Sequence, residues 1–236
     1  TKFSILNENF KIKKIYNIET KKILNNSTKN KIFKEILKKK ISKKVLFSSV
    51  VPKAFKVIKK KLTINRFKVF EIKELNIKKI LKIKVKNYNQ LGSDRISNAL
   101  GSFHYNNCLV IDFGTATTFD IIKNQIYVGG VISPGINLSI INLNKSTALL
   151  PLLNLKKSQK SYGKNTQEAL NAGFIWGYEG LINNIIKKIL SKTNVKFTII
   201  LTGGYAKLFS KKIKNKTIID ENITIKGISK AFKELI

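Results

Sequence analysis

The stretch Cys108-Leu109-Val110-Ile111-Asp112-Phe113-Gly114-Thr115-Ala116-Thr117-Thr118-Phe119-Asp120 decides the fold of this 236-residue chain. Its first four residues are a continuous apolar run and predict a buried strand, so Asp112 stands where that strand meets a turn. Gly114 lets the backbone turn and lets an anion approach main-chain N–H groups, and the Thr115 hydroxyl adds a donor. The pattern favours a phosphate-holding turn beside a carboxylate that can bind a cation.

The residues after this turn predict a β-hairpin. The chain re-enters a strand at residues 117–122, turns at Asn124-Gln125 and returns at residues 126–132. Taken alone, the stretch is as well explained by a hairpin whose Gly and Thr serve only turn geometry and β propensity. Its neighbours favour a phosphoryl-transfer site: Gly92-Ser93-Asp94-Arg95 before it, and Gly129-Gly130-Val131-Ile132-Ser133-Pro134-Gly135 after it.

Six short segments follow one another along the chain. They are Ser48-Ser49-Val50-Val51-Pro52, the GSDR segment at 92–95, the DFGTATTFD segment at 112–120, GGVISPGI at 129–136, Gly163-Lys164-Asn165-Thr166 and Leu201-Thr202-Gly203-Gly204-Tyr205-Ala206. In this order they resemble the type III pantothenate kinases, of the acetate and sugar kinase, Hsp70 and actin superfamily. The resemblance implies an α/β fold of two actin-like (ribonuclease H-like) lobes with a cleft between them. We place the N-terminal lobe at residues 1–95 and the C-terminal lobe at 96–236.

The same resemblance implies an activity. Members of this family phosphorylate pantothenate to 4′-phosphopantothenate with ATP, the first step of coenzyme A biosynthesis. It implies Mg²⁺ with the ATP, a monovalent cation (K⁺ or NH₄⁺) and a homodimer. Some family members have been described as transcriptional accessory factors. The alternative is therefore a non-catalytic relative that binds a ligand or nucleic acid.

Asp94 is the expected catalytic base. Phosphoryl transfer to an alcohol needs a carboxylate that accepts the hydroxyl proton, and the family assigns this role to the Asp of its Gly-x-Asp-Arg segment. From the residues alone, the favoured interpretation is that Asp94 caps a helix at 96–100; the resemblance to the family favours the base instead. By resemblance, Gly92, Ser93, Asp94 and Arg95 form part of the pantothenate pocket. A surface salt bridge is the alternative for Arg95. The family's usual Tyr and Pro before this segment are replaced by Val85 and Tyr88, which puts that wall of the pocket in doubt.

The remaining site residues also come from the resemblance. Asp112 corresponds to the residue that binds the monovalent cation, and Thr115 to an ATP contact. Thr166 matches a pantothenate-binding Thr that the family supplies across its dimer interface; as an alternative or in addition, it caps the long helix predicted after it.

The start of the chain departs from the family pattern. Family members open with Asp-x-Gly-Asn-Thr on the first strand, whereas this sequence begins at Thr1 and contains no Met. We expect the first strand to be truncated and the ATP site of the given chain to be incomplete. Thr1 and Lys2, which would directly follow the missing segment, are expected to contact ATP.

Composition limits the remaining possibilities. The chain is 43% hydrophobic, which predicts a folded core, and no apolar run approaches the roughly 18 residues of a membrane span. The single Cys108 excludes an internal disulfide and fits the cytoplasm. His104, Trp176 and Cys108 lack partners at metal or nucleophile spacing and are expected to be structural.

The net charge of +33 would ordinarily suggest nucleic acid as a partner. All of the basic residues except Arg66 and Arg95 are lysines, however, and they are scattered along the chain. Base-reading proteins favour the planar Arg fork, so we interpret the charge as a bias of the whole proteome and expect no specific nucleic-acid partner. Nonspecific attraction of ATP and RNA at low salt is still expected.

Other elements follow from periodicity. We predict a helix at residues 21–40, a helix starting at Pro52 and a long helix at about 167–191. Strands are predicted at 3–6, 10–16, 45–51, 67–72, 83–85 and 197–201, and further helices after Pro134 and near Ala206 and Ile228.

Overall fold

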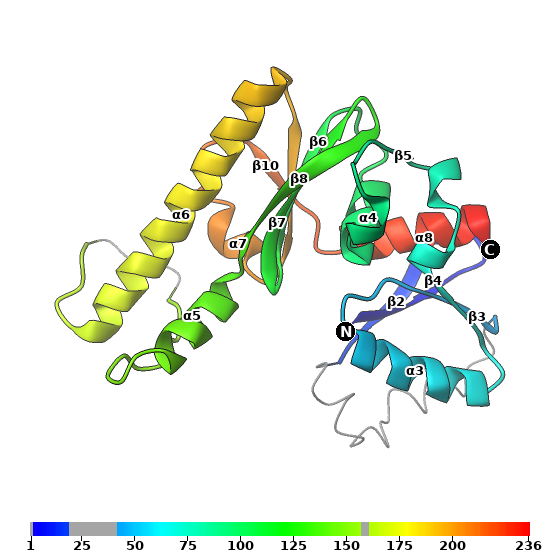
Figure 1. The fold of residues 1–236 in the computed structure, drawn as a ribbon, viewed down its shortest axis with the longest axis horizontal. Coiled ribbons are helices and arrows are strands. Elements are labelled where there is room, and N and C mark those ends of the chain that lie inside the picture. Colours follow the sequence, from blue (N-terminus) through cyan, green and yellow to red (C-terminus); the bar gives the residue numbers. More distant parts are fainter. Residues whose placement is uncertain (1, 19–41, 157–160) are drawn as a thin grey trace. The chain divides into compact units, whose positions relative to one another are not determined.

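The computed structural model describes residues 2–18, 42–156 and 161–236. Close backbone contacts divide the chain into two compact units, Thr1–Ser102 with Ile223–Ile236 and Phe103–Asn222, here called unit 1 and unit 2 (Figure 1). These units do not follow the predicted lobe limits of 1–95 and 96–236, because the C-terminal helix packs within unit 1. The helix predicted at 21–40 lies outside the described residues.

The described part of unit 1 contains two strand pairs. Strands β1 (Lys2–Leu6) and β2 (Ile12–Asn17) are antiparallel, and β3 (Lys44–Phe47) and β4 (Lys68–Glu71) are parallel. Helix α3 (Pro52–Ile64) joins the parallel pair as a crossover and begins at its proline, whose missing N–H is tolerated in the first turn. Its apolar stripe buries Ala54, Ile58 and Leu62 against Ile18 and Phe67.

Short elements lead from β4 to the segment that carries Asp94. The 3₁₀ helices η1 (Ile72–Glu74), η2 (Ile77–Lys79) and η3 (Tyr88–Gln90), with the two-residue strand β5 (Lys82–Ile83), precede helix α4 (Ser93–Gly101). Helix α8 (Ile223–Leu235) returns to unit 1 and lies beside α4 (Figure 1). The Thr224 hydroxyl donates to Asn98 Oδ1 at 2.7 Å across this contact.

Unit 2 is built on a mixed sheet. Strands β6 (Cys108–Phe113), β7 (Ala116–Lys123) and β8 (Ile126–Pro134) are consecutive and antiparallel, whereas β9 (Thr198–Gly203) and β10 (Thr217–Ile219) extend the other side in parallel. The order is β10-β9-β6-β7-β8. Three antiparallel strands followed by two parallel ones is the strand order of a ribonuclease H-like lobe, so the predicted α/β class is confirmed.

Three helices of unit 2 contribute to its core. They are α5 (Ile136–Lys145), α6 (Thr166–Thr193) and α7 (Ala206–Phe209). Alternate residues of β6, among them Leu109, Ile111 and Phe113, pack with Ile182 and Ile186 of α6 in one buried cluster. Because alternate strand residues point to opposite faces, Asp112 belongs to the other face of the sheet.

The predicted hairpin and long helix are confirmed. Asn124 and Gln125 both have positive φ, 51° and 59°, as a tight two-residue hairpin turn requires. The strand predicted at 45–51 is shorter, because β3 ends at Phe47. No helix in the described part of the chain is long and apolar enough to cross a membrane.

Candidate active site

Asp112 lies at the end of β6, the central strand of the unit 2 sheet. It is in register with Thr118 of β7 and Thr202 of β9, so the three oxygen-bearing side chains share one face. Asp112 is half-buried, and both threonines are buried. Such a set of hard oxygens suits an oxygen-preferring cation. Among the described residues no three His, Cys, Asp or Glu side chains form a metal cluster, so hydroxyl and carbonyl oxygens would have to complete the shell.

Gly203 holds the backbone close to Asp112. Its φ is +87°, and an added Cβ would stand 2.7 Å from Asp112 Oδ1 and 2.6 Å from the Phe113 carbonyl oxygen. The next residue, Gly204, donates its N–H to the same Phe113 carbonyl at 3.1 Å. Only glycine fits this conformation and this space at position 203, so Gly203 lets the end of β9 pack closely against the end of β6.

Thr115 stands at the exposed tip of the turn between β6 and β7. The Gly114 N–H donates to the Ala116 carbonyl at 3.1 Å, which closes the turn. Gly135 packs against this turn so tightly that a Cβ would lie 2.0 Å from the Thr115 carbonyl oxygen. The predicted contacts Asp112 and Thr115 therefore occur together in unit 2, at one end of its sheet.

The GSDR segment lies in unit 1, at the start of α4. The helix N-cap is Gly92 and has no side-chain cap, so the alternative that Asp94 is the N-cap residue is wrong. Asp94 lies in the first turn, half-buried, and its Oδ1 accepts the Arg95 N–H at 2.8 Å. A Cβ at Gly92 would stand only 2.5 Å from that oxygen, so Gly92 leaves the space that the carboxylate occupies.

Glu71 is a residue of this region that sequence reasoning missed. Its Oε1 accepts the Ser93 hydroxyl at 2.6 Å, although the two residues are 22 positions apart. Ser93 is 3% exposed. The sequence offered one indirect signal, which is that acidic residues are rare in this chain, with 13 against 46 basic residues. Glu71 is one of these few, and it ends strand β4.

Tyr88 lies close to the same carboxylate. Burial, and then the charge of Glu71, raise the pKa of its phenol above the ordinary value. Tyr88 is the first residue of η3. Its carbonyl oxygen accepts the N–H of Leu91, and this hydrogen bond closes the turn. Tyr88 therefore lies in the turn that directly precedes the GSDR segment.

Thr166 is the first residue of α6 and is exposed. The alternative that it caps the helix is wrong, because the N-cap is Asn165, whose Oδ1 accepts the Glu168 N–H at 3.0 Å. The Thr166 hydroxyl is thus not required for capping. Of the two residues expected to contact ATP at the start of the chain, Thr1 lies outside the described residues and Lys2 is an exposed residue that begins β1.

Known proteins are similar to this chain in sequence and in fold. The profile of the type III pantothenate kinases matches residues 1–188. A type III pantothenate kinase of Pelagibacter ubique (strain HTCC1062) is 44% identical over 236 residues, covering 98% of this chain and 94% of the relative. One from Sulfurihydrogenibium sp. (strain YO3AOP1) is 38% identical over 192 residues, covering 78% and 75%.

A solved structure is similar in fold. A conserved protein from Campylobacter jejuni, assigned to the Baf family of transcriptional activators, superposes with a TM-score of 0.57 at 22% identity and covers 86% of this chain and 87% of its own. At this identity the likeness concerns the fold alone. The profile match and the 44% identity to the Pelagibacter protein over nearly the full length of both chains show that this chain belongs to the type III pantothenate kinase family.

Proposed function

We propose that this chain transfers the γ-phosphoryl group of ATP to the primary hydroxyl of pantothenate, giving 4′-phosphopantothenate in the cytoplasm, with Asp94 as general base. Family membership supports the reaction. The observation that carries the role of Asp94 is its carboxylate, half-buried in the first turn of α4 and held by the Arg95 N–H at 2.8 Å. A base held in one orientation accepts a proton without first losing rotational freedom.

The chemistry asks little more of the protein than positioning. Asp94 takes the hydroxyl proton as the new O–P bond forms and the bond to the ADP oxygen breaks. The Arg95 guanidinium, beside it on α4, is suited to hold a carboxylate of the substrate through two parallel hydrogen bonds. Gly92 and Ser93 supply the close backbone approach at the start of the helix.

Unit 2 supplies the nucleotide and cation contacts of the proposal. Thr115 at the turn tip donates to ATP phosphates, and Thr1 and Lys2 are the other residues that we propose contact ATP. Asp112, flanked in register by Thr118 and Thr202, holds K⁺ or NH₄⁺, and Mg²⁺ accompanies the ATP. A bound cation would offset the negative charge that gathers on the transferring phosphoryl group.

A homodimer is the proposed assembly. Large apolar side chains stay exposed in unit 2 over β8, α5, the following segment and α6; they include Ile132, Leu138, Ile141, Leu149, Leu152 and Trp176. An exposed apolar surface of this kind is typical of a protein interface. Thr166, exposed at the start of α6, is then available to the pantothenate site of the second subunit.

The test measures ATP-dependent phosphorylation of pantothenate by the protein as its gene encodes it, in K⁺ and in Na⁺. Asp94→Asn is expected to abolish turnover while the circular dichroism spectrum and the melting temperature stay unchanged. Glu8→Gln, which removes an equal charge at an exposed position, is the matched control and should retain activity. A folded and active Asp94→Asn variant contradicts the role as base, and an inactive wild-type protein contradicts the reaction.

The dimer has its own measurement. Sedimentation velocity should give twice the monomer mass, and Trp176→Glu should give the monomer. Thr166→Ala should raise the KM for pantothenate without changing the sedimentation coefficient. A monomeric, fully active wild-type protein would overturn the shared site.

A further inference from the structure

We infer that Glu71 is a positioning residue for the reaction, because it fixes the first turn of α4 through the Ser93 hydroxyl. This rests on the proposed role of Asp94, which is the next residue along the chain. The Ser93 Oγ to Glu71 Oε1 distance of 2.6 Å is that of a short hydrogen bond to a charged acceptor. Ser93 is almost fully buried, so water does not compete for its hydroxyl.

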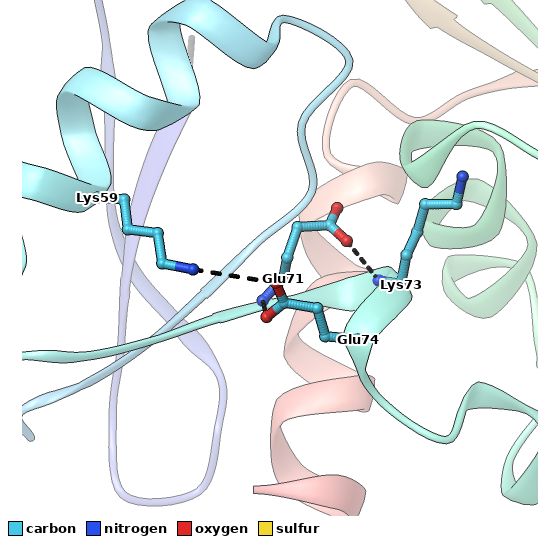
Figure 2. Close-up of polar contacts among 4 residues, drawn as sticks. All are labelled: Lys59, Glu71, Lys73 and Glu74. Carbon is cyan, nitrogen blue, oxygen red and sulfur yellow. Dashed lines mark hydrogen bonds and ion pairs between the residues drawn. The ribbon is translucent and has the colours of Figure 1, made fainter. Parts of the chain in front are cut away.

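The carboxylate of Glu71 is itself held in place. Its Oε2 accepts the Lys73 N–H at 2.7 Å, while Glu74 Oε2 accepts the N–H of Glu71 at 3.2 Å, which makes a reciprocal capping box around η1. Lys59 of α3 lies 3.9 Å from Glu74 Oε1. Figure 2 shows these contacts among Lys59, Glu71, Lys73 and Glu74. Because one oxygen of Glu71 is used within the turn, the other is directed to Ser93 in a single orientation.

A second tie runs from the same turn to the residues before the GSDR segment. Lys73 Nζ donates to the Asn89 carbonyl at 2.8 Å, within η3. The turn at 71–74 thus holds the chain at Asn89 and again at Ser93, on either side of the bend that leads into α4. Asp94 and Arg95 directly follow Ser93, so their backbone position depends on the bond between Ser93 and Glu71.

The charge of Glu71 also suits its place. A carboxylate close to the first turn of a helix interacts favourably with the N-terminal end of the helix dipole. A merely structural reading is that Glu71 caps η1 and nothing more. The bond to Ser93 distinguishes the two, because it joins η1 to a different helix, the one that carries the proposed base.

A double-mutant cycle tests this assignment. Glu71→Ala and Ser93→Ala should each lower kcat about tenfold, roughly the loss expected for one hydrogen bond to a charged group. The double variant should lose no more than either single one, because both remove the same bond. Glu71→Gln, whose amide oxygen can still accept from Ser93, should recover part of kcat.

Glu74→Ala is the matched control. It removes the other carboxylate of the same capping box but leaves the Lys73 N–H and Ser93 bonds of Glu71, so it should lower the melting temperature about as much as Glu71→Ala while kcat falls far less than in Glu71→Ala. Amide hydrogen exchange at Arg95 and Ile96 should speed up in Glu71→Ala and not in Glu74→Ala, a readout that needs no turnover.

Two results overturn the assignment. One is a Glu71→Ala variant with wild-type kcat and exchange rates, and the other is a cycle in which the two losses simply add. Failure of the proposed function is distinguishable, since it would appear as an active Asp94→Asn variant or an inactive wild-type protein while the exchange result remained as expected.

Discussion

Gly227 of α8 and Ser97 of α4 touch through their backbones: a Cβ added at Gly227 would stand 1.8 Å from the Ser97 carbonyl oxygen. Gly101 makes the reverse contact, with a Cβ position 2.1 Å from the Ile223 carbonyl oxygen. Two glycines, one on each helix, therefore let α4 and α8 pack at a distance that any side chain would prevent. Since α4 also carries Asp94, packing against α8 holds in place the helix that carries the proposed base.

The first prediction concerns this contact. Gly227→Ala must push the helices apart, so it should lower the free energy of unfolding by about 1–3 kcal/mol, the usual range for overpacking. Gly180→Ala in α6, where an added Cβ meets nothing within 4 Å, is the control and should raise it by about 0.5–1 kcal/mol. Urea unfolding measures both. An unchanged midpoint for Gly227→Ala would contradict the packing.

Gly92→Ala should separate activity from stability. The backbone of Gly92, at φ −63° and ψ 144°, is open to alanine, so the melting temperature should fall by only a few degrees, the usual loss when alanine replaces glycine at an N-cap. The new Cβ nevertheless occupies space 2.5 Å from Asp94 Oδ1 and displaces the carboxylate. We expect kcat to fall by roughly tenfold or more. Full activity in steady-state kinetics would show that the observed carboxylate position is not needed.

Two adjacent glycines allow a paired comparison at the cation side. Gly203→Ala combines a positive φ with a collision against Asp112 and Phe113, and should cost roughly 2–4 kcal/mol. Gly204→Ala meets nothing within 4 Å and should change stability by less than about 0.5 kcal/mol. Thermal unfolding compares the two. Gly203→Ala should also raise the K⁺ concentration needed for half-maximal activity; an unaltered K⁺ dependence would separate Gly203 from the cation site.

The phenol of Tyr88 should report on Glu71. Its pKa is raised first by burial and then by the Glu71 charge, so Glu71→Gln should lower that pKa while leaving it above the ordinary value of 10.0. Because the folded-state pKa is the higher one, the stability that Tyr88 contributes is complete below pH 10 and is lost as the pH rises through the folded-state value. Ultraviolet titration of the phenolate, corrected with Tyr88→Phe, measures the shift. A pKa unaffected by Glu71→Gln would place the carboxylate too far away.

Much of unit 2 could be predicted because local patterns decide it. Three of its elements have clear local signals in the sequence: the apolar run of β6, the turn residues at Asn124 and the long periodic stretch of α6. The mutual position of Asp112 and Gly203 was not predicted, because the pairing of two parallel strands that are far apart in the sequence leaves no local pattern. The capping of α6 was misassigned by one residue, because Asn165 and Thr166 are both good caps and only the backbone decides between them.

The features missed in unit 1 are long-range. Nothing near Glu71 in the sequence indicates Ser93, and the glycines of α4 and α8 acquire their meaning only when the two helices meet. A charge count shows that acids are rare but not which of them is used. Such contacts are set by tertiary packing, which a reading of periodicity does not reach.

The pairing of α4 with α8 also orders events during synthesis. Thr224 and Asn98 are 126 positions apart, and all of unit 2 lies between them. The ribosome therefore synthesises all of unit 2 before it synthesises α8, the partner of α4. During that interval the side of α4 that carries Gly101 has no helix packed against it. Unit 2 is one continuous stretch of chain and can fold as soon as it is synthesised, whereas unit 1 cannot be completed until residues 223–236 are made. We therefore expect unit 2 to complete its folding first.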